Sequence, residues 1–124
     1  MLKKITYQDK DWILKIRNQA SVRKGSFNSK AILRKENDAF WKVKRNAYAI
    51  IDNDIPVGVI IINEANVVSI YLDEASRNKG LAYAHLKKLN LKGCTADIKP
   101  GNASSLKLFK KLGFVQERIT FVKK

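Results

Sequence analysis

The chain has few of the residues that build disulfides and metal centres. Its 124 residues include one cysteine, one histidine and two prolines. Cys94 cannot form an internal disulfide, and His85 stands nine residues before it, a spacing that matches no metal-ligand motif. The sequence therefore predicts neither a metal site nor a disulfide framework, and a cytoplasmic location is the default expectation.

Long hydrophobic runs are also missing. The longest, Pro56 to Ile62, suits a buried strand and falls far short of the ~20 residues of a membrane span. Polar sequence follows Met1, so no cleavable signal peptide is expected. The Gly-x-x-x-x-Gly-Lys-Ser/Thr and Gly-x-Gly-x-x-Gly loops are absent as well, which makes ATP and NAD poor candidate ligands.

Acidic residues are scarce. Eleven Asp and Glu stand against 25 Lys and Arg, so the formal net charge is +14. Such a balance favours polyanionic partners, namely nucleic acid, an acidic membrane surface or phosphorylated small molecules. The hydrophobic content of 45% is enough for a packed core, and the length predicts one domain over residues 1–124.

Apolar periodicity and turn residues predict the order β-α-α-β-β-β-α-β-α-β. The expected strands cover residues 2–6, 48–51, 57–62, 67–72, 95–99 and 114–122. Residues 21–30 are expected to be a loop. An antiparallel meander followed by β-α-β units predicts an α/β (α+β) fold. Its mixed, mostly antiparallel sheet of about six strands is flanked by four helices on both faces.

Two motifs follow one another in the second half of the chain. The strand 67–72 leads into Arg77-Asn-Lys-Gly-Leu-Ala82 and a helix, which places free backbone N–H groups where a pyrophosphate can bind. Gly80 allows close approach of the backbone to phosphate. The second motif, Asn102-x-x-Ser105-x-x-x-Phe109-x-Lys111-x-Gly113-Phe114, predicts an amphipathic helix capped by its asparagine and ended by its glycine.

In this order, with one strand between them, the two motifs resemble the acetyl-CoA-binding half of the GNAT family of N-acetyltransferases. The match runs from Val67 to Phe114, somewhat over a third of the chain. It implies acetyl-CoA as co-substrate, bound where strand 67–72 splays from strand 95–99 and leaves backbone groups free for the pantetheine arm. The cofactor-binding residues it implies are Ile70, Leu72, Arg77, Asn78, Lys79, Gly80, Leu81, Ala82, Asn102, Ser105, Phe109 and Lys111.

The N-terminal third is similar to one branch of that family, on the pattern Ile16-Arg-Asn18, Val22-Arg23, Phe27, Ile32 and Phe40-Trp41. That branch includes bacterial enzymes that acetylate amino sugars on nucleotide carriers and relatives that act on ribosomal protein N-termini. The resemblance implies an acceptor pocket with Asn18, Arg23 and Phe27. An anionic nucleotide-linked amino sugar is the preferred acceptor. The acceptor side is expected to be either open or completed by the second subunit of a homodimer.

The proton-transfer residues depart from the family pattern. Phe109 stands where many members carry a tyrosine acid, and Phe109 cannot donate a proton. Val67 stands where relatives often carry a glutamate base. Glu64 and Tyr71 are the catalytic candidates that remain nearby, and the general base is left open.

Three functions therefore compete. The leading interpretation is transfer of acetyl from acetyl-CoA to a primary amine, with a protein N-terminus as the second acceptor. The alternatives are a basic nucleic-acid-binding module and a GNAT-like domain that binds CoA without catalysis. The sequence contains no aromatic RNA-binding strand motif and no recognition-helix signature, although its charge would suffice for nonspecific binding.

Overall fold

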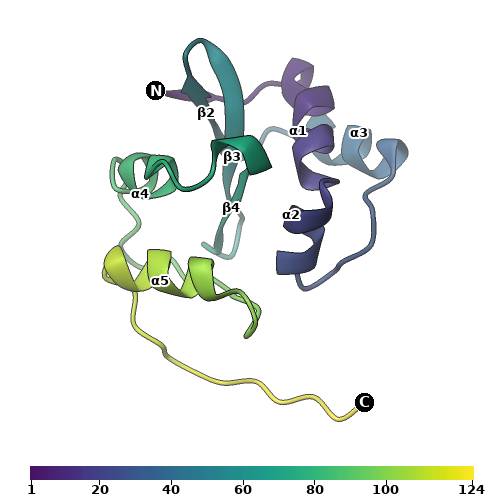
Figure 1. Ribbon diagram of the computed structural model, residues 1–124. Helices are drawn as coiled ribbons and strands as arrows, with labels where there is room; N and C mark the ends of the chain where they lie inside the picture. The colour runs from purple at the N-terminus through teal and green to yellow at the C-terminus, as the bar shows by residue number, and fades with distance from the viewer.

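The computed structural model describes residues 1–124 and centres on a four-stranded antiparallel sheet with the strand order β1-β2-β3-β4 (Figure 1). The strands are β1 (Leu2–Lys4), β2 (Asn46–Asp52), β3 (Ile55–Ile62) and β4 (Val68–Leu72). Asn53 and Asp54 join β2 to β3 with positive φ angles of 51° and 64°. Asn and Asp tolerate this left-handed geometry, which matches the twist of a tight hairpin.

Five helices cover the two faces of the sheet. They are α1 (Lys10–Arg17), α2 (Ala20–Gly25), α3 (Arg34–Lys42), α4 (Leu81–Leu86) and α5 (Ala103–Lys111). Figure 1 shows α1, α2 and α3 on one side of the strands and α4 and α5 on the other. Short 3-10 turns at Tyr7–Asp9 and Glu74–Ser76 precede α1 and follow β4. The longest helices, α3 and α5, have nine residues each, and none of the helices meets the length and hydropathy of a membrane span.

The central strand β3 supplies both hydrophobic cores. From Gly58 to Ile62 its residues alternate between faces, as strand geometry requires, and a β-bulge opposite Ile50 and Ile51 turns Val57 to the face of Ile60. Val59 and Ile61 pack with Ile13 and Trp41 beneath α1 and α3. Ile60, between them in sequence, belongs to a second cluster with Ile50, Val57, Val68, Leu86 and Phe109. The sequence prediction of an α/β fold with helices on both faces of the sheet is confirmed.

Two predicted strands are wrong. Residues 95–99 meet the sheet through one parallel bridge, between Val67 and Thr95, and then leave it. Residues 114–122 have no regular secondary structure, and Val115 and Phe121 are almost fully exposed. Their alternating pattern favours a strand, but a strand needs a paired neighbour, and 95–99 does not supply one. The sheet therefore has four strands rather than about six.

The predicted loop at 21–30 is also wrong in its first half, because α2 occupies Ala20–Gly25. This helix buries Val22 alone, so it gives no 3.6-residue periodicity in the sequence. Its Ser and Gly residues favour a turn, and tertiary packing overrides that preference.

Candidate functional site

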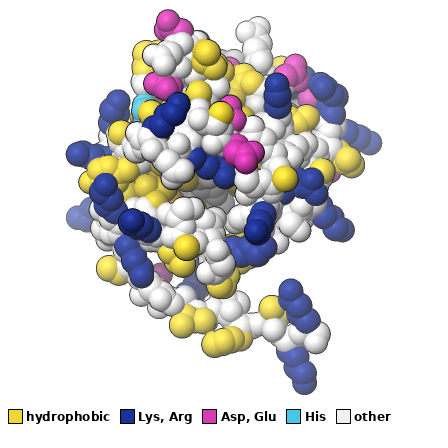
Figure 2. Space-filling view, in the orientation of Figure 1, with side chains coloured by type: hydrophobic (Ala, Val, Ile, Leu, Met, Phe, Trp, Pro, Cys, Tyr) yellow, Lys and Arg dark blue, Asp and Glu magenta, His cyan; other side chains and the backbone are white.

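A cleft of about 360 Å³ opens between β4 and the segment 96–98. It exists because the two segments are joined only around Thr95. The Val68 N–H donates to the Thr95 carbonyl over 2.8 Å and the Thr95 N–H donates to the Asn66 carbonyl over 2.9 Å, and beyond these bonds the segments diverge. The cleft is lined by Arg17, Gly25, Ser26, Phe27, Asn28, Asn63, Val67, Val68, Ser69, Ile70, Tyr71, Ala96, Asp97, Ile98, Asn102, Ser105 and Phe109. Figure 2 shows the molecule hollowed near the middle of this face, with basic side chains around the hollow.

One wall of the cleft is an open strand edge. In an antiparallel pair, alternate residues direct their backbone groups away from the neighbouring strand. Val68 does so, since its N–H bonds Thr95, and Ile70 and Leu72 share that direction. The Leu72 carbonyl accepts a bond from Arg77 Nη2 at 3.3 Å. Ile70 faces the cleft with no strand opposite, so its backbone can pair with an extended amide-bearing ligand.

The loop beyond β4 is held by a glutamine from the α1–α2 junction. Gln19 Nε2 donates to Asp73 Oδ1 at 2.9 Å, and Gln19 Oε1 accepts from the Glu74 N–H at 2.9 Å. Asp73 also accepts from the Ala75 N–H. These bonds fix the exit of β4 directly before the predicted phosphate-binding residues.

Those residues, Arg77 to Ala82, form a left-handed turn into α4. Asn78 and Gly80 have φ angles of 62° and 72°. The N–H groups from Lys79 to Ala82 make no hydrogen bond within the chain, as is usual for a first helical turn. No atom lies within 4 Å of the position a Gly80 Cβ would take. The α4 helix itself has six residues.

The opposite wall begins at Asn102, which caps α5. Its Oδ1 accepts from the Ser105 N–H at 3.2 Å, and its Nδ2 donates to the Gly25 carbonyl at 3.4 Å. Phe109 is 5% exposed and its ring lies edge-on to that of Phe114, with centroids 5.0 Å apart. The cap, Ser105 and Phe109 thus present one face of α5 to the cleft.

The acceptor residues expected from the sequence lie in different places. Phe27 is at the cleft and 67% exposed. Asn18 instead holds the Ile32 backbone, accepting from its N–H at 2.7 Å and donating to its carbonyl at 2.9 Å. Arg23 Nε donates to the Ser29 carbonyl at 3.0 Å. Both side chains therefore shape the loop after α2.

Two further predicted residues are not brought to the cleft. Glu64 is exposed in the turn between β3 and β4 and is not among the lining residues. Lys111 lies at the far end of α5, with its Nζ 4.2 Å from the centre of the Tyr83 ring. Tyr71, the other catalytic candidate, does line the cleft.

The cleft also contains charged residues that the sequence analysis missed. Asp97 is its only carboxylate, and Arg17 is its only cation. A signal existed for Asp97, because aspartate is depleted in strands and this one stands within the predicted strand 95–99. Arg17 precedes Asn18 in the pattern quoted above, but nothing local to the sequence shows which way its side chain turns.

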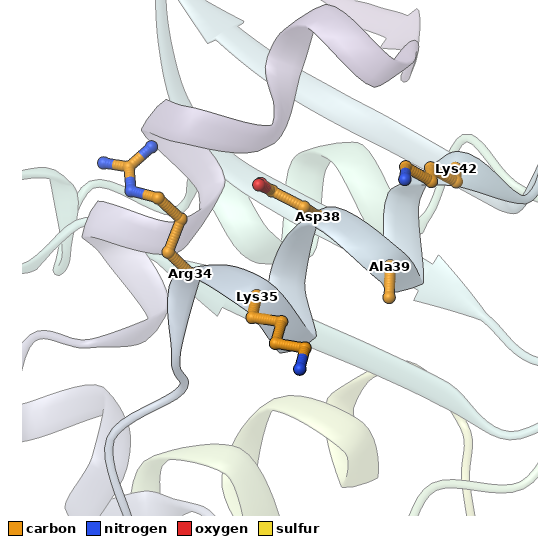
Figure 3. A pocket seen from close by; sticks show the side chains of 5 residues that line it. All are labelled: Arg34, Lys35, Asp38, Ala39 and Lys42. Carbon is orange, nitrogen blue, oxygen red and sulfur yellow. The ribbon is translucent and has the colours of Figure 1, made fainter.

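A second hollow lies on the surface of α3 (Figure 3). Its five lining residues, Arg34, Lys35, Asp38, Ala39 and Lys42, all come from that helix. Lys10 Nζ lies 3.2 Å from Asp38 Oδ1, and this interaction with the Asp38 carboxylate raises the pKa of Lys10 above its ordinary value. One helix provides no opposing wall, so the cleft beside β4 is the better candidate site.

No family model matches the chain, and no curated protein sequence does. Solved structures match its fold. An N-acetyltransferase from Staphylococcus aureus Mu50 is 24% identical, with a TM-score of 0.77, over 92% of this chain and 82% of that one. A GNAT-family acetyltransferase from Bacillus anthracis is 18% identical, with a TM-score of 0.77, over 94% of this chain and 80% of that one.

A third match is the protein yncA of Salmonella typhimurium, whose structure contains its cofactor acetyl-CoA. It is 21% identical, with a TM-score of 0.75, over 92% of this chain and 78% of that one. These likenesses establish the GNAT-type fold. The chemistry of the site must be argued from its own residues.

Proposed function

We propose that the protein is an N-acetyltransferase that moves acetyl from acetyl-CoA to a primary amine. The observation that carries the proposal is the cleft beside β4, whose open edge at Ile70 leads toward the turn at Gly80. An extended amide chain fits the first feature and a pyrophosphate fits the second. CoA contains both groups in that order, and the similar fold of yncA holds acetyl-CoA.

The cofactor would lie along the cleft with its pantetheine arm paired to Ile70. Asn102, Ser105 and Phe109 would form the other side of that channel. The pyrophosphate would take the free N–H groups from Lys79 to Ala82, and Lys79 would add charge. Arg77 would act indirectly, because its guanidinium ties the turn to the end of β4 at Leu72.

The reaction needs one base and a route for the leaving thiolate. The amine nitrogen attacks the thioester carbonyl, the C–S bond breaks, and the ammonium proton must leave the nitrogen. Asp97 is the only carboxylate on the lining and is our candidate base, directly or through one water. Tyr71 is the candidate to supply a proton to sulfur, and backbone N–H groups would stabilise the oxyanion.

The acceptor we favour is anionic, with a nucleotide-linked amino sugar first and a protein N-terminus second. The net charge of +14 supports an anionic partner. The same charge favours the alternative of a nucleic-acid-binding module, which would need no cofactor.

Titration calorimetry with acetyl-CoA and with an oligonucleotide, each at two salt concentrations, tests the proposal. We expect acetyl-CoA to bind and to weaken moderately with salt, because exposed charges are screened over ~10 Å at 0.1 M. A steep salt dependence with the oligonucleotide, together with no CoA binding, would overturn the enzyme assignment in favour of nucleic-acid binding.

A further inference from the structure

Arg17 ends α1 and its side chain lies across β4. The guanidinium carbon is 4.5 Å from the centre of the Tyr71 ring, and Nη2 makes a long bond of 3.5 Å to Tyr71 Oη. The residue is half-buried and lines the cleft. Arg17 therefore presents a positive charge at the wall where the acceptor would enter.

The charge of Arg17 has no carboxylate partner within the protein, and its only cation–π contact is with the Tyr71 ring. The chain's ion pairs join Lys10 to Asp11 and Asp38, and Arg34 to Asp11, and none involves Arg17. A guanidinium has five N–H donors, and this one uses a single donor. Its Nε is buried without any acceptor. Unpaired charge of this kind is costly in a folded protein, and an apolar side chain would cover the Tyr71 ring equally well.

The position of Arg17 separates it from the cofactor phosphates. Tyr71 packs with the cluster under α1 and α3. The α4 helix, which follows the phosphate turn, packs through Leu86 into the cluster on the opposite face. A ligand group at Arg17 therefore belongs to the molecule that enters from the α1 side of the sheet.

We propose that Arg17 binds an anionic group, a carboxylate or a phosphate, carried by the acceptor close to its reacting amine. This inference rests on the proposed function and narrows its acceptor class. The planar guanidinium can hold either oxyanion through two parallel hydrogen bonds. Its contact with the face of the Tyr71 ring holds the plane of the guanidinium in place. Asp97 is the only carboxylate on the lining and pairs with no arginine, so it leaves the donors of Arg17 available.

A side-chain NMR titration tests the binding directly. The ¹⁵N–H signal of Arg17 Nε, assigned by its loss in Arg17→Gln, is followed during addition of sodium acetate and of inorganic phosphate, with and without saturating CoA. We expect a saturable shift with at least one anion that persists when CoA fills its own site. The stronger anion identifies carboxylate or phosphate as the acceptor group.

Arg34 is the matched control, since it is exposed on α3 and paired with Asp11. No shift at Arg17 would mean that the anion does not bind there. A shift with the same midpoint as at Arg34 would mean nonspecific screening. Either result would overturn the proposal. Failure of CoA to bind would instead refute the proposed enzyme, and the titration without CoA would still decide the role of Arg17.

Matched acceptor pairs give the second readout, measured by thiol release. The pairs are phosphoethanolamine with ethanolamine, and L-methionine with L-methioninamide. We expect the wild type to prefer the anionic member of one pair, and Arg17→Gln to reduce that preference by about 10- to 100-fold, mainly through KM. Arg17→Lys should restore part of it. An equal loss for charged and neutral acceptors would show a merely structural role, and the titration decides alone if neither pair is turned over.

Discussion

The side chain of Asn102 connects two walls of the cleft that lie 77 residues apart in sequence. Its Nδ2 donates to the Gly25 carbonyl over 3.4 Å while its Oδ1 caps α5 at Ser105. Lys99 Nζ reinforces the connection through the Lys24 carbonyl at 3.2 Å. The end of α2 is thus held by the segment that precedes α5, and the width of the cleft depends on those bonds.

Replacing Asn102 should separate its capping role from its bridging role. Asn102→Ala removes both and should lower the free energy of unfolding by about 1 kcal/mol from the cap alone. Asn102→Ser keeps a capping oxygen and loses the amide donor. We expect both variants to bind acetyl-CoA more weakly in calorimetry at a temperature where each is folded. If only the melting temperature falls, Asn102 is a structural residue.

Gly25→Ala tests the bridge from its other end. A Cβ there would lie 2.9 Å from Asn102 Nδ2, so the amide must rotate away. In the Asn102→Ala background, the same change should stabilise by about 0.5–1 kcal/mol through helix propensity. In the wild type, that gain should be largely cancelled. Chemical denaturation of the four proteins measures the coupling, and additive effects would show that the contact carries no energy.

Gly80→Val should weaken acetyl-CoA binding strongly, because the phosphate would meet a branched side chain. The left-handed φ of 72° adds a backbone cost of about 1–2 kcal/mol. Gly93→Val is the matched control, since Gly93 has a φ of 84° and open space around it, as Gly80 does. Both variants should lose similar stability, and only Gly80→Val should lose affinity. Unchanged affinity in folded Gly80→Val would remove the cofactor argument.

Asp97→Asn should lower kcat by about 10²–10⁴-fold with little change in acetyl-CoA affinity, as expected on loss of a positioned base. Added formate should restore part of the rate in Asp97→Ala, where space is left for a small carboxylate. Glu64→Gln provides the competing measurement. A large loss of kcat in Glu64→Gln, together with an active Asp97→Asn, would show that the general base is Glu64, in the turn between β3 and β4.

Phe109→Tyr should leave acetyl-CoA affinity similar and the rate unchanged, or raised by less than the ~10²–10⁴ of a positioned acid. The Phe109 ring is buried against Phe114. The leaving group is the CoA thiol, which resembles the thiol of free cysteine with its pKa of ~8.5, so it can leave as a thiolate among N–H donors. The pH–rate profiles of the two proteins give the comparison. If a basic limb of the wild-type profile disappears on mutating Tyr71, that tyrosine supplies the proton, as proposed above, and a hydroxyl at position 109 is redundant.

The sequence predicted the parts of the fold and site that depend on local patterns. The cap at Asn102 and the turn at Gly80 follow from residue types that suit those backbone geometries, and the structure contains both. The predicted strand 95–99 does not form along its length, because a short local pattern does not show whether a neighbouring strand pairs with all of it. The single bridge at Thr95 is a tertiary property.

Charged cleft residues were harder to predict for a similar reason. In the sequence, Arg17 is one of 25 Lys and Arg residues, and such side chains are mostly exposed to solvent. Its distinction is the contact with Tyr71, 54 residues away. Asn18 and Arg23 were singled out by resemblance, and their hydrogen bonds to Ile32 and Ser29 show that the same residues hold a loop.

Because the residues of β3 alternate between two cores, different side chains lie beneath the proposed acceptor site and beneath the proposed CoA channel. Val59 and Ile61 pack beneath α1, which carries Arg17, and α3, whereas Ile60 packs beneath α4 and α5, beside the proposed cofactor channel. On the proposed function, a substitution beneath α1 is therefore expected to alter which amine is accepted while the proposed CoA channel keeps its shape. Selection for a new acceptor in the laboratory should accordingly enrich changes on the Val59 face and spare the Ile60 face.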